Sequence, residues 1–243
     1  MQKLLKNKKI EFLNYLENVR GYSDLTIKSY DEVLIEALPI IEITQDNKQM
    51  IFNLMPYRLK ISNLNPKTIS KKLSAIRSFS SYLNQNDMNV LLQADDSVKI
   101  AKTLPKPVSH KYIMEALELS NQHENLVVTM LYTLGLRISE LCSLKLEDIS
   151  SGWIRIIGKG NKQRDIPLLV NVQELIDDYL NLNPKKIFLF ESNDKRLSEN
   201  SLRYTVNKVF KRVGLKVSPH QLRHSYATEL LNHNASISDV SEL

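Results

Sequence analysis

Apolar residues recur at helical spacing through the first part of the chain. In residues 7–20, Ile10, Leu13 and Leu16 lie about one turn apart, which predicts a helix that turns these side chains toward a core. A second helix is expected over residues 24–38, because a run of capping residue types precedes it and a proline follows it. This part of the chain is therefore expected to form a helical module.

The clearest helical signal starts at Asn65, a capping residue, followed by Pro66 at the first helical position. The predicted apolar stripe consists of Ile69, Leu73, Ile76, Phe79 or Ser80, and Leu83. The other face carries Lys67, Lys71, Ser74 and Ser78. Ammonium and hydroxyl groups of this kind bond phosphate oxygens, so the periodicity separates a buried side from a side suited to a polyanion.

The second part of the chain has a mixed pattern. Helices are expected at 109–119, 124–143, 170–181, 198–213 and 219–233. Two β-rich runs, 153–157 and 163–168, flank turn residues and predict a hairpin with Lys159 at its tip. The predicted fold class is thus mostly α with a small β-hairpin or sheet.

A proline-rich segment divides the two parts. Residues 103–108 hold two prolines spaced by one residue, which favours an extended strut over a helix. We expect an N-terminal helical domain at 1–102, this linker, and a second domain at 109–243.

Charge sharpens the picture of the first domain. The net charge is +6, of which +5 falls in residues 1–107 and +1 in residues 108–243. Residues 47–86 contain seven Lys and Arg but no acid, which favours a surface that faces a polyanion over a merely solvated one. The apolar runs are too short for a membrane helix, and the single cysteine, Cys142, excludes a disulfide framework or a cysteine zinc site. A cytoplasmic protein without membrane contact is expected.

Candidate chemistry centres on a few single cations. His220 and Arg223 share one face just after a helix start, where backbone N–H groups also point outward, and this arrangement suits a phosphate. His224, one turn after His220, raises the alternative of a metal pair, but no third ligand is evident and no metal site is expected. Arg137 emerges from an apolar run, with Glu140 as a structural ion-pair partner.

The order of these segments resembles the tyrosine site-specific recombinases of the Xer/phage-integrase family over nearly the whole chain. Residues 135–141 resemble the segment of the first catalytic arginine, residues 157–162 resemble the catalytic-lysine hairpin, and residues 220–228 match the family's His-x-x-Arg box. Residues 25–30 and 71–79 resemble the core-binding module of the family. The resemblance implies a SAM-like helical domain followed by the recombinase catalytic domain.

That resemblance implies DNA strand exchange through a 3′-phosphotyrosyl intermediate, without metal, ATP or other cofactor. By motif, Arg137 and Arg223 bind the phosphate, Lys159 protonates the leaving oxygen, and His220 assists; Glu140 and His224 support the site. The implied DNA-binding residues are Lys67, Thr68, Lys71, Lys72 and Arg77. The implied partner is double-stranded DNA, with a homotetramer assembled on it by the full-length protein.

One departure from the family pattern bears on activity. The family places a second histidine, within Leu-Gly-His, and then the nucleophilic tyrosine beyond the box, and the sequence reaches Leu243 before either. We therefore expect the chain as given to be a monomer that binds DNA and does not cleave it. A catalytically inert DNA-binding or architectural protein of the same fold stays open as an alternative, as does a relaxing type IB topoisomerase, which the lysine hairpin disfavours. Chromosome-dimer resolution and mobile-element integration use the same chemistry.

Overall fold

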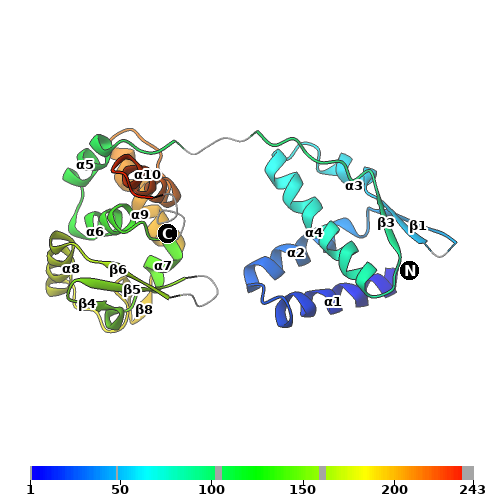
Figure 1. Cartoon of the computed structure of the whole chain (residues 1–243), viewed down its shortest axis with the longest axis horizontal. Coiled ribbons are helices and arrows are strands. Elements are labelled where there is room, and N and C mark those ends of the chain that lie inside the picture. The colour runs from blue at the N-terminus through cyan, green and yellow to red at the C-terminus, as the bar shows by residue number, and fades with distance from the viewer. Residues whose placement is uncertain (1, 48, 102–105, 159–162, 237–243) are drawn as a thin grey trace. The chain divides into compact units, whose positions relative to one another are not determined.

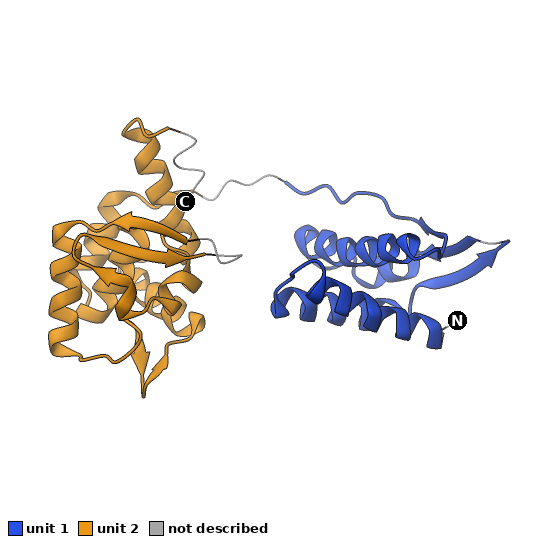
Figure 2. Cartoon of the chain, turned by 60° about the horizontal axis from the view of Figure 1, so that its bottom comes forward, with its two compact units in different colours: residues 1–102 blue, residues 103–243 orange. Residues whose placement is uncertain are grey.

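The computed structural model describes the chain except for residues 1, 48, 102–105, 159–162 and 237–243. Two compact units divide it, residues 1–102 and residues 103–243 (Figure 2). The fold is mostly helical with small sheets, as the sequence predicted. None of the helices in the described ranges is long and apolar enough to cross a membrane.

The N-terminal unit combines a helical layer with a small sheet (Figure 1). Its helices are α1 (Gln2–Asn18), α2 (Asp24–Ala37), α3 (Met55–Lys60) and α4 (Pro66–Gln85). Its strands are β1 (Glu42–Asp46), β2 (Gln49–Asn53) and β3 (Val90–Gln93), with β2 central, antiparallel to β1 and parallel to β3. The predicted helical domain is confirmed, and the three strands add a small sheet that the sequence analysis did not predict.

Helix α4 confirms the predicted separation of faces. The Asn65 side chain accepts a hydrogen bond from the backbone N–H of Lys67 at 3.0 Å, which caps the helix ahead of Pro66. The buried residues of α4 are Leu73, Ala75, Ile76, Phe79, Ser80 and Leu83. Lys67 and Lys71 are exposed on another side. The core of the unit therefore lies along one stripe of α4 and leaves its basic side open.

Helix α1 confirms Leu13 and Leu16 of the predicted stripe and corrects Ile10. Ile10 is 56% exposed, whereas Leu5, Phe12 and Leu16 are buried. The Phe12 ring lies 5.4 Å from the Phe79 ring of α4, centroid to centroid, and aromatic packing of this kind draws the Phe12 side of the helix inward. Because α1 begins well before residue 7, its own first turns supply Leu5 to the same stripe.

The C-terminal unit is built around one buried helix, α6. Its helices are α5 (His110–Glu118), α6 (Gln122–Thr133), α7 (Ile138–Ser143), α8 (Val170–Leu182), α9 (Glu199–Arg212) and α10 (Pro219–Asn232). Helices α8, α9 and α10 all pack against α6, and Leu126, Val127 and Leu131 of α6 lie in the core. A short 3-10 turn, Leu146–Asp148, leads into the sheet.

The sheet of this unit is antiparallel, in the order β4 (Ile149–Ser150), β5 (Trp153–Ile157), β6 (Gln163–Pro167). It contains the predicted hairpin, with Ile154 opposite Ile166 and Ile156 opposite Arg164. A separate two-stranded ribbon joins β7 (Glu191–Ser192) and β8 (Lys195–Arg196). The hairpin places the strand of Arg164 against the helical core.

The single helix predicted over residues 124–143 is in fact two. Helix α6 ends at Thr133, and α7 begins at Ile138. Between them Gly135 adopts a φ of +58°, a left-handed conformation that glycine takes without the steric cost that other residues meet. The break leaves Arg137 at the N-cap of α7 rather than inside a helix, and this position decides where its side chain points.

Candidate functional site

The turn between α6 and α7 positions the first predicted arginine. Arg137 has extended backbone angles at the N-cap of α7, and its side chain is 49% exposed. Its backbone N–H donates to Glu140 Oε2 at 2.8 Å, and its Nη1 donates to Glu140 Oε1 at 2.8 Å. The carboxylate thus fixes the main chain and the side chain of Arg137 together.

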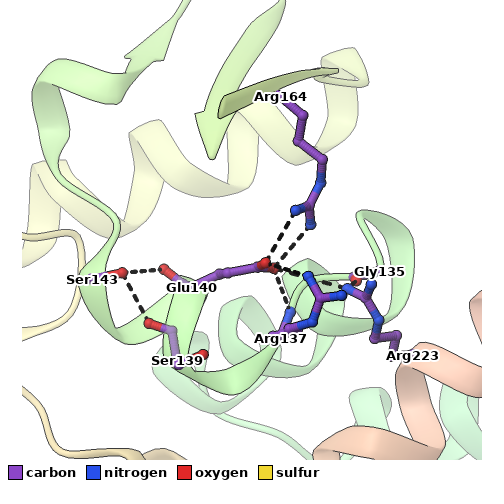
Figure 3. A network of polar contacts seen from close by, with 7 residues as sticks. All are labelled: Gly135, Arg137, Ser139, Glu140, Ser143, Arg164 and Arg223. Carbon is purple, nitrogen blue, oxygen red and sulfur yellow. Dashed lines mark hydrogen bonds and ion pairs between the residues drawn. The ribbon is translucent and has the colours of Figure 1, made fainter. Parts of the chain in front are cut away.

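Glu140 is the centre of a cluster of cations (Figure 3). Its side chain is only 3% exposed, and Arg164 of β6 donates to both of its oxygens, at 3.0 and 2.9 Å. Burial alone would raise the pKa of Glu140, but the hydrogen bonds from Arg164 and Arg137 outweigh it and lower that pKa below its usual range. The group is therefore a buried carboxylate that stays ionised because it is paired.

The second predicted arginine approaches from α10. The Arg223 side chain is 14% exposed, and its Nη1 donates to the backbone carbonyl of Gly135. The same Nη1 lies 3.9 Å from Glu140 Oε2. Burial and then the charge of Arg137 lower the pKa of Arg223, which marks two guanidinium groups crowded together. A bound anion between such groups would relieve their repulsion.

His220 lies one turn before Arg223, in the first turn of α10. The Ser218 hydroxyl accepts from the backbone N–H of Gln221 at 3.3 Å and caps the helix. The His220 ring is 4.6 Å from the His224 ring, and burial, followed by the charges of His224, Arg223 and Arg137, lowers the pKa of His220. The lowered pKa favours the neutral imidazole, which can donate or accept a hydrogen bond.

These side chains share one open pocket of about 520 Å³. Arg137, His220 and Arg223 line it, together with Glu199 and Arg203 of α9. No tyrosine of the described residues lines this pocket. Nor do those residues contain a group of three or more His, Cys, Asp or Glu side chains that could hold a metal ion. The arrangement suits an anionic group held by guanidinium groups, as a phosphate is.

The predicted lysine and DNA-binding residues differ in their surroundings. Lys159 lies outside the described residues. Lys67, Thr68 and Lys71 are exposed together on α4. Two other predicted DNA-binding residues are engaged within the fold instead. Lys72 pairs with Glu36 of α2, and Arg77 donates through Nε to both carboxylate oxygens of Asp95 at 2.9 and 2.8 Å.

Sequence reasoning missed Arg164, although a signal for it existed. In a strand, alternate residues face the same side, so Arg164 shares a face with Ile166, which is buried. An arginine at an inward-facing strand position requires a buried anion as a partner. Here that anion is Glu140. The carbonyl of Gly135 as a partner of Arg223 had no comparable signal in the sequence.

Residues 81–243 match the phage integrase family, and residues 10–86 match the N-terminal SAM-like domain of phage integrases. The chain belongs to the phage integrase family of tyrosine recombinases. The resemblance inferred from the motifs is thereby confirmed, as is the pairing of a SAM-like domain with a catalytic domain.

Among curated relatives, a tyrosine recombinase of Thermosipho africanus is 31% identical, with 96% of this chain and 88% of the relative covered. The tyrosine recombinase XerC of Staphylococcus aureus strain USA300 is 29% identical, with coverage of 96% and 85%.

Solved structures share the fold. A XerH site-specific recombinase bound to a palindromic difH substrate, in a post-cleavage complex, has a TM-score of 0.73 at 21% identity, with 98% of this chain and 81% of that chain covered. A lambda integrase tetramer bound to a Holliday junction has a TM-score of 0.72 at 16% identity, with coverage of 97% and 75%.

Proposed function

We propose that this chain binds duplex DNA for site-specific recombination and holds one backbone phosphate in the pocket of Arg137, Arg223 and His220. The observation that carries the proposal is the convergence of two guanidinium groups and an imidazole, from two separate helices, on one open pocket. Guanidinium donors match the two non-bridging oxygens of a phosphodiester, which a lysine would contact only as a point charge.

The same groups suit the transition state of phosphoryl transfer. When a tyrosine hydroxyl attacks phosphorus and the 5′-oxygen leaves, negative charge spreads over the non-bridging oxygens, where fixed cations stabilise it. We assign Arg137 and Arg223 to those oxygens and His220 to a hydrogen bond or proton transfer beside them. By the family resemblance, Lys159 gives its proton to the leaving 5′-oxygen. Each step conserves the phosphodiester bond energy, so no nucleotide is required.

We further propose that residues 1–243 bind DNA without forming a covalent product. No tyrosine among the described residues lines the pocket. The Tyr226 ring, although it belongs to α10, packs on Gly135, and burial raises the pKa of its hydroxyl, which disfavours the phenolate. The inert DNA-binding protein of the same fold, the alternative reading, shares this part of the proposal.

On DNA we propose a tetramer, supported by the similarity in fold to the lambda integrase tetramer. The open side of α4 supports a contact of the N-terminal unit with phosphates. Lys67 and Lys71 lie one turn apart there, both exposed, with Thr68 beside them.

Salt-dependent binding to duplex DNA tests that contact. If Lys67 and Lys71 each neutralise one phosphate, the K67A/K71A variant should bind more weakly and lower the slope of log K against log salt by about 1.8. The K3A/K6A variant removes the same charge from exposed positions of α1 and serves as the control. Equal slopes for wild type and K67A/K71A would contradict this contact.

A suicide-substrate assay tests the chemistry. A duplex selected by the chain from a random-sequence pool is nicked near the centre of the protected region, so that a cleaved strand cannot religate. We expect retention of the duplex without a protein–DNA adduct. A covalent adduct would show that a tyrosine within residues 1–243 is a nucleophile. Failure to select any duplex would contradict DNA binding itself.

A further inference from the structure

Three arginines surround one buried carboxylate, but they use it differently. Arg164 places its Nη1 and Nη2 on the two oxygens of Glu140 at 3.0 and 2.9 Å (Figure 3). Arg137 uses one side-chain nitrogen and its backbone N–H, each at 2.8 Å. Arg223 stays 3.9 Å away and donates to the carbonyl of Gly135 instead.

This division matches the capacity of the carboxylate. An ionised carboxylate has about four lone-pair sites that accept hydrogen bonds. The four donors from Arg137 and Arg164 fill all of them, so Glu140 has no acceptor site left for Arg223. Two of these four donors come from Arg137, and the other two come from Arg164, which is not one of the predicted catalytic residues.

Arg164 is itself committed to this contact. Its side chain is 22% exposed, it does not line the pocket, and its Nε is buried without a hydrogen-bond partner in the described part of the chain. A guanidinium that leaves one buried donor unpaired forgoes a hydrogen bond, and here the planar fit to Glu140 is the gain that offsets it.

We propose that Arg164 is a positioning residue for the phosphate site: by filling two acceptor sites of Glu140, it keeps Arg223 and the free N–H groups of Arg137 available to the phosphate. The inference rests on the proposed function of the pocket. Without Arg164, two sites of a buried carboxylate would fall vacant beside Arg223, whose Nη1 is already 3.9 Å from Oε2. Electrostatic attraction would then draw Arg223 and Arg137 onto Glu140 and away from the pocket.

Titration with inorganic phosphate, followed through the ring-proton NMR signals of His220, measures this effect. R164M should weaken phosphate binding by about tenfold or more, the size expected when a charged donor leaves an anion. The matched control is R155M, which removes an arginine from the same hairpin that makes a two-bond ion pair with exposed Asp165. This control should bind phosphate like the wild type.

A second substitution separates positioning from simple damage to the fold. In R164M/E140Q the carboxylate charge that attracts the other arginines is gone, so phosphate should bind at least about threefold more tightly than in R164M. It should bind less tightly than in the wild type, because Glu140 also orients Arg137. Removing an unpaired buried carboxylate would also restore stability, so the recovery supports positioning only where urea unfolding shows that R164M itself remains folded.

The pKa of His220 gives an independent readout. The charged groups around it are Arg223 and His224 on α10, Arg137 at the start of α7, and Arg203 and Glu199 across the pocket on α9. If the guanidinium groups of Arg223 and Arg137 move toward Glu140 in R164M, their repulsion of a protonated His220 weakens and this pKa rises. It should not rise in R155M.

The outcomes are distinct. If the wild type shows no phosphate-dependent shift of His220, the proposed function of the pocket fails. If the wild type binds phosphate and R164M binds it equally well, or if R164M/E140Q stays as weak as R164M, the positioning role of Arg164 is overturned. Should R164M not fold, R164K carries the test, because an ammonium cannot span both oxygens of Glu140; unchanged phosphate affinity in R164K would also overturn the proposal.

Discussion

Substitution of Gly135 by alanine should destabilise the C-terminal unit more than its small size suggests. Gly135 has a φ of +58°, and a Cβ built there would lie 2.4 Å from Tyr226 Cδ1 and 2.7 Å from Cε1. The left-handed conformation costs an alanine about 1–2 kcal/mol. Pushing the half-buried Tyr226 ring aside adds an overpacking cost of about 1–3 kcal/mol. The free energy of unfolding should therefore fall by about 2–5 kcal/mol.

Urea unfolding monitored by tryptophan fluorescence reports this unit alone, because Trp153 of β5 is the single tryptophan of the sequence. The control is G152A, at a φ of +84° with no atom within 4 Å of the added Cβ, which isolates the backbone cost. In a Y226A background, G135A should lose its steric part and cost no more than G152A. If G135A and G152A destabilise the wild-type unit equally, the close approach of Tyr226 does not constrain this turn.

Two further substitutions test buried polar contacts of the same unit. The side chain of Glu124 is 3% exposed, and hydrogen bonds from Arg212 hold its pKa at about 2. The stabilisation that Glu124 contributes is therefore present above its ordinary pKa of 4.5 and is lost as the pH falls toward 2. E124Q should flatten the pH dependence of the free energy of unfolding in urea over that interval. An E124Q curve parallel to wild type would contradict this pairing. Ser225 Oγ accepts from the backbone N–H of Val108 at 2.8 Å, and S225A should cost about 1–3 kcal/mol by leaving that N–H unpaired. Hydrogen exchange of the Val108 amide should accelerate in S225A, and an unchanged rate would refute the bond.

The elements that could be predicted from the sequence are those whose signal is local. Helix α4 is predicted by Asn65, Pro66 and an apolar stripe, and these signals lie within the helix itself or directly before it. The His220–Arg223 pair likewise depends only on helical spacing after a capped start. Local geometry is enough to place both side chains on the same pocket.

The elements that escaped prediction depend on distant partners. Strand β1 is polar and mostly exposed, so it shows no alternation, and β2 pairs in parallel with β3 only after two intervening helices. The stripe of α1 is decided by the aromatic rings of α4. The break at Gly135 lies in a largely apolar run, where a helix is the default reading, and the ring that approaches Gly135, Tyr226 of α10, is distant in the sequence.

The charge of the N-terminal unit also depends on partners that are distant in the sequence. Residues 47–86 hold no acid, yet Glu36 and Asp95, from outside this run, form ion pairs with Lys72 and Arg77. The basic surface of α4 is therefore narrower than the sequence count implies, and Lys67 and Lys71 are the residues left on its open side.

Around the pocket, positive charge exceeds negative charge. Arg137, Arg164 and Arg223 surround a single carboxylate, so the cluster keeps two positive charges in excess. Burial and then the charge of Arg137 lower the pKa of Arg223. Glu140 orients the cluster without neutralising it. The remaining repulsion favours a bound anion over water, most strongly when that anion gains negative charge, as a phosphodiester does during transfer. The site is held together by one buried carboxylate and keeps an excess of positive charge. It is thus already arranged for the phosphate that it is proposed to bind.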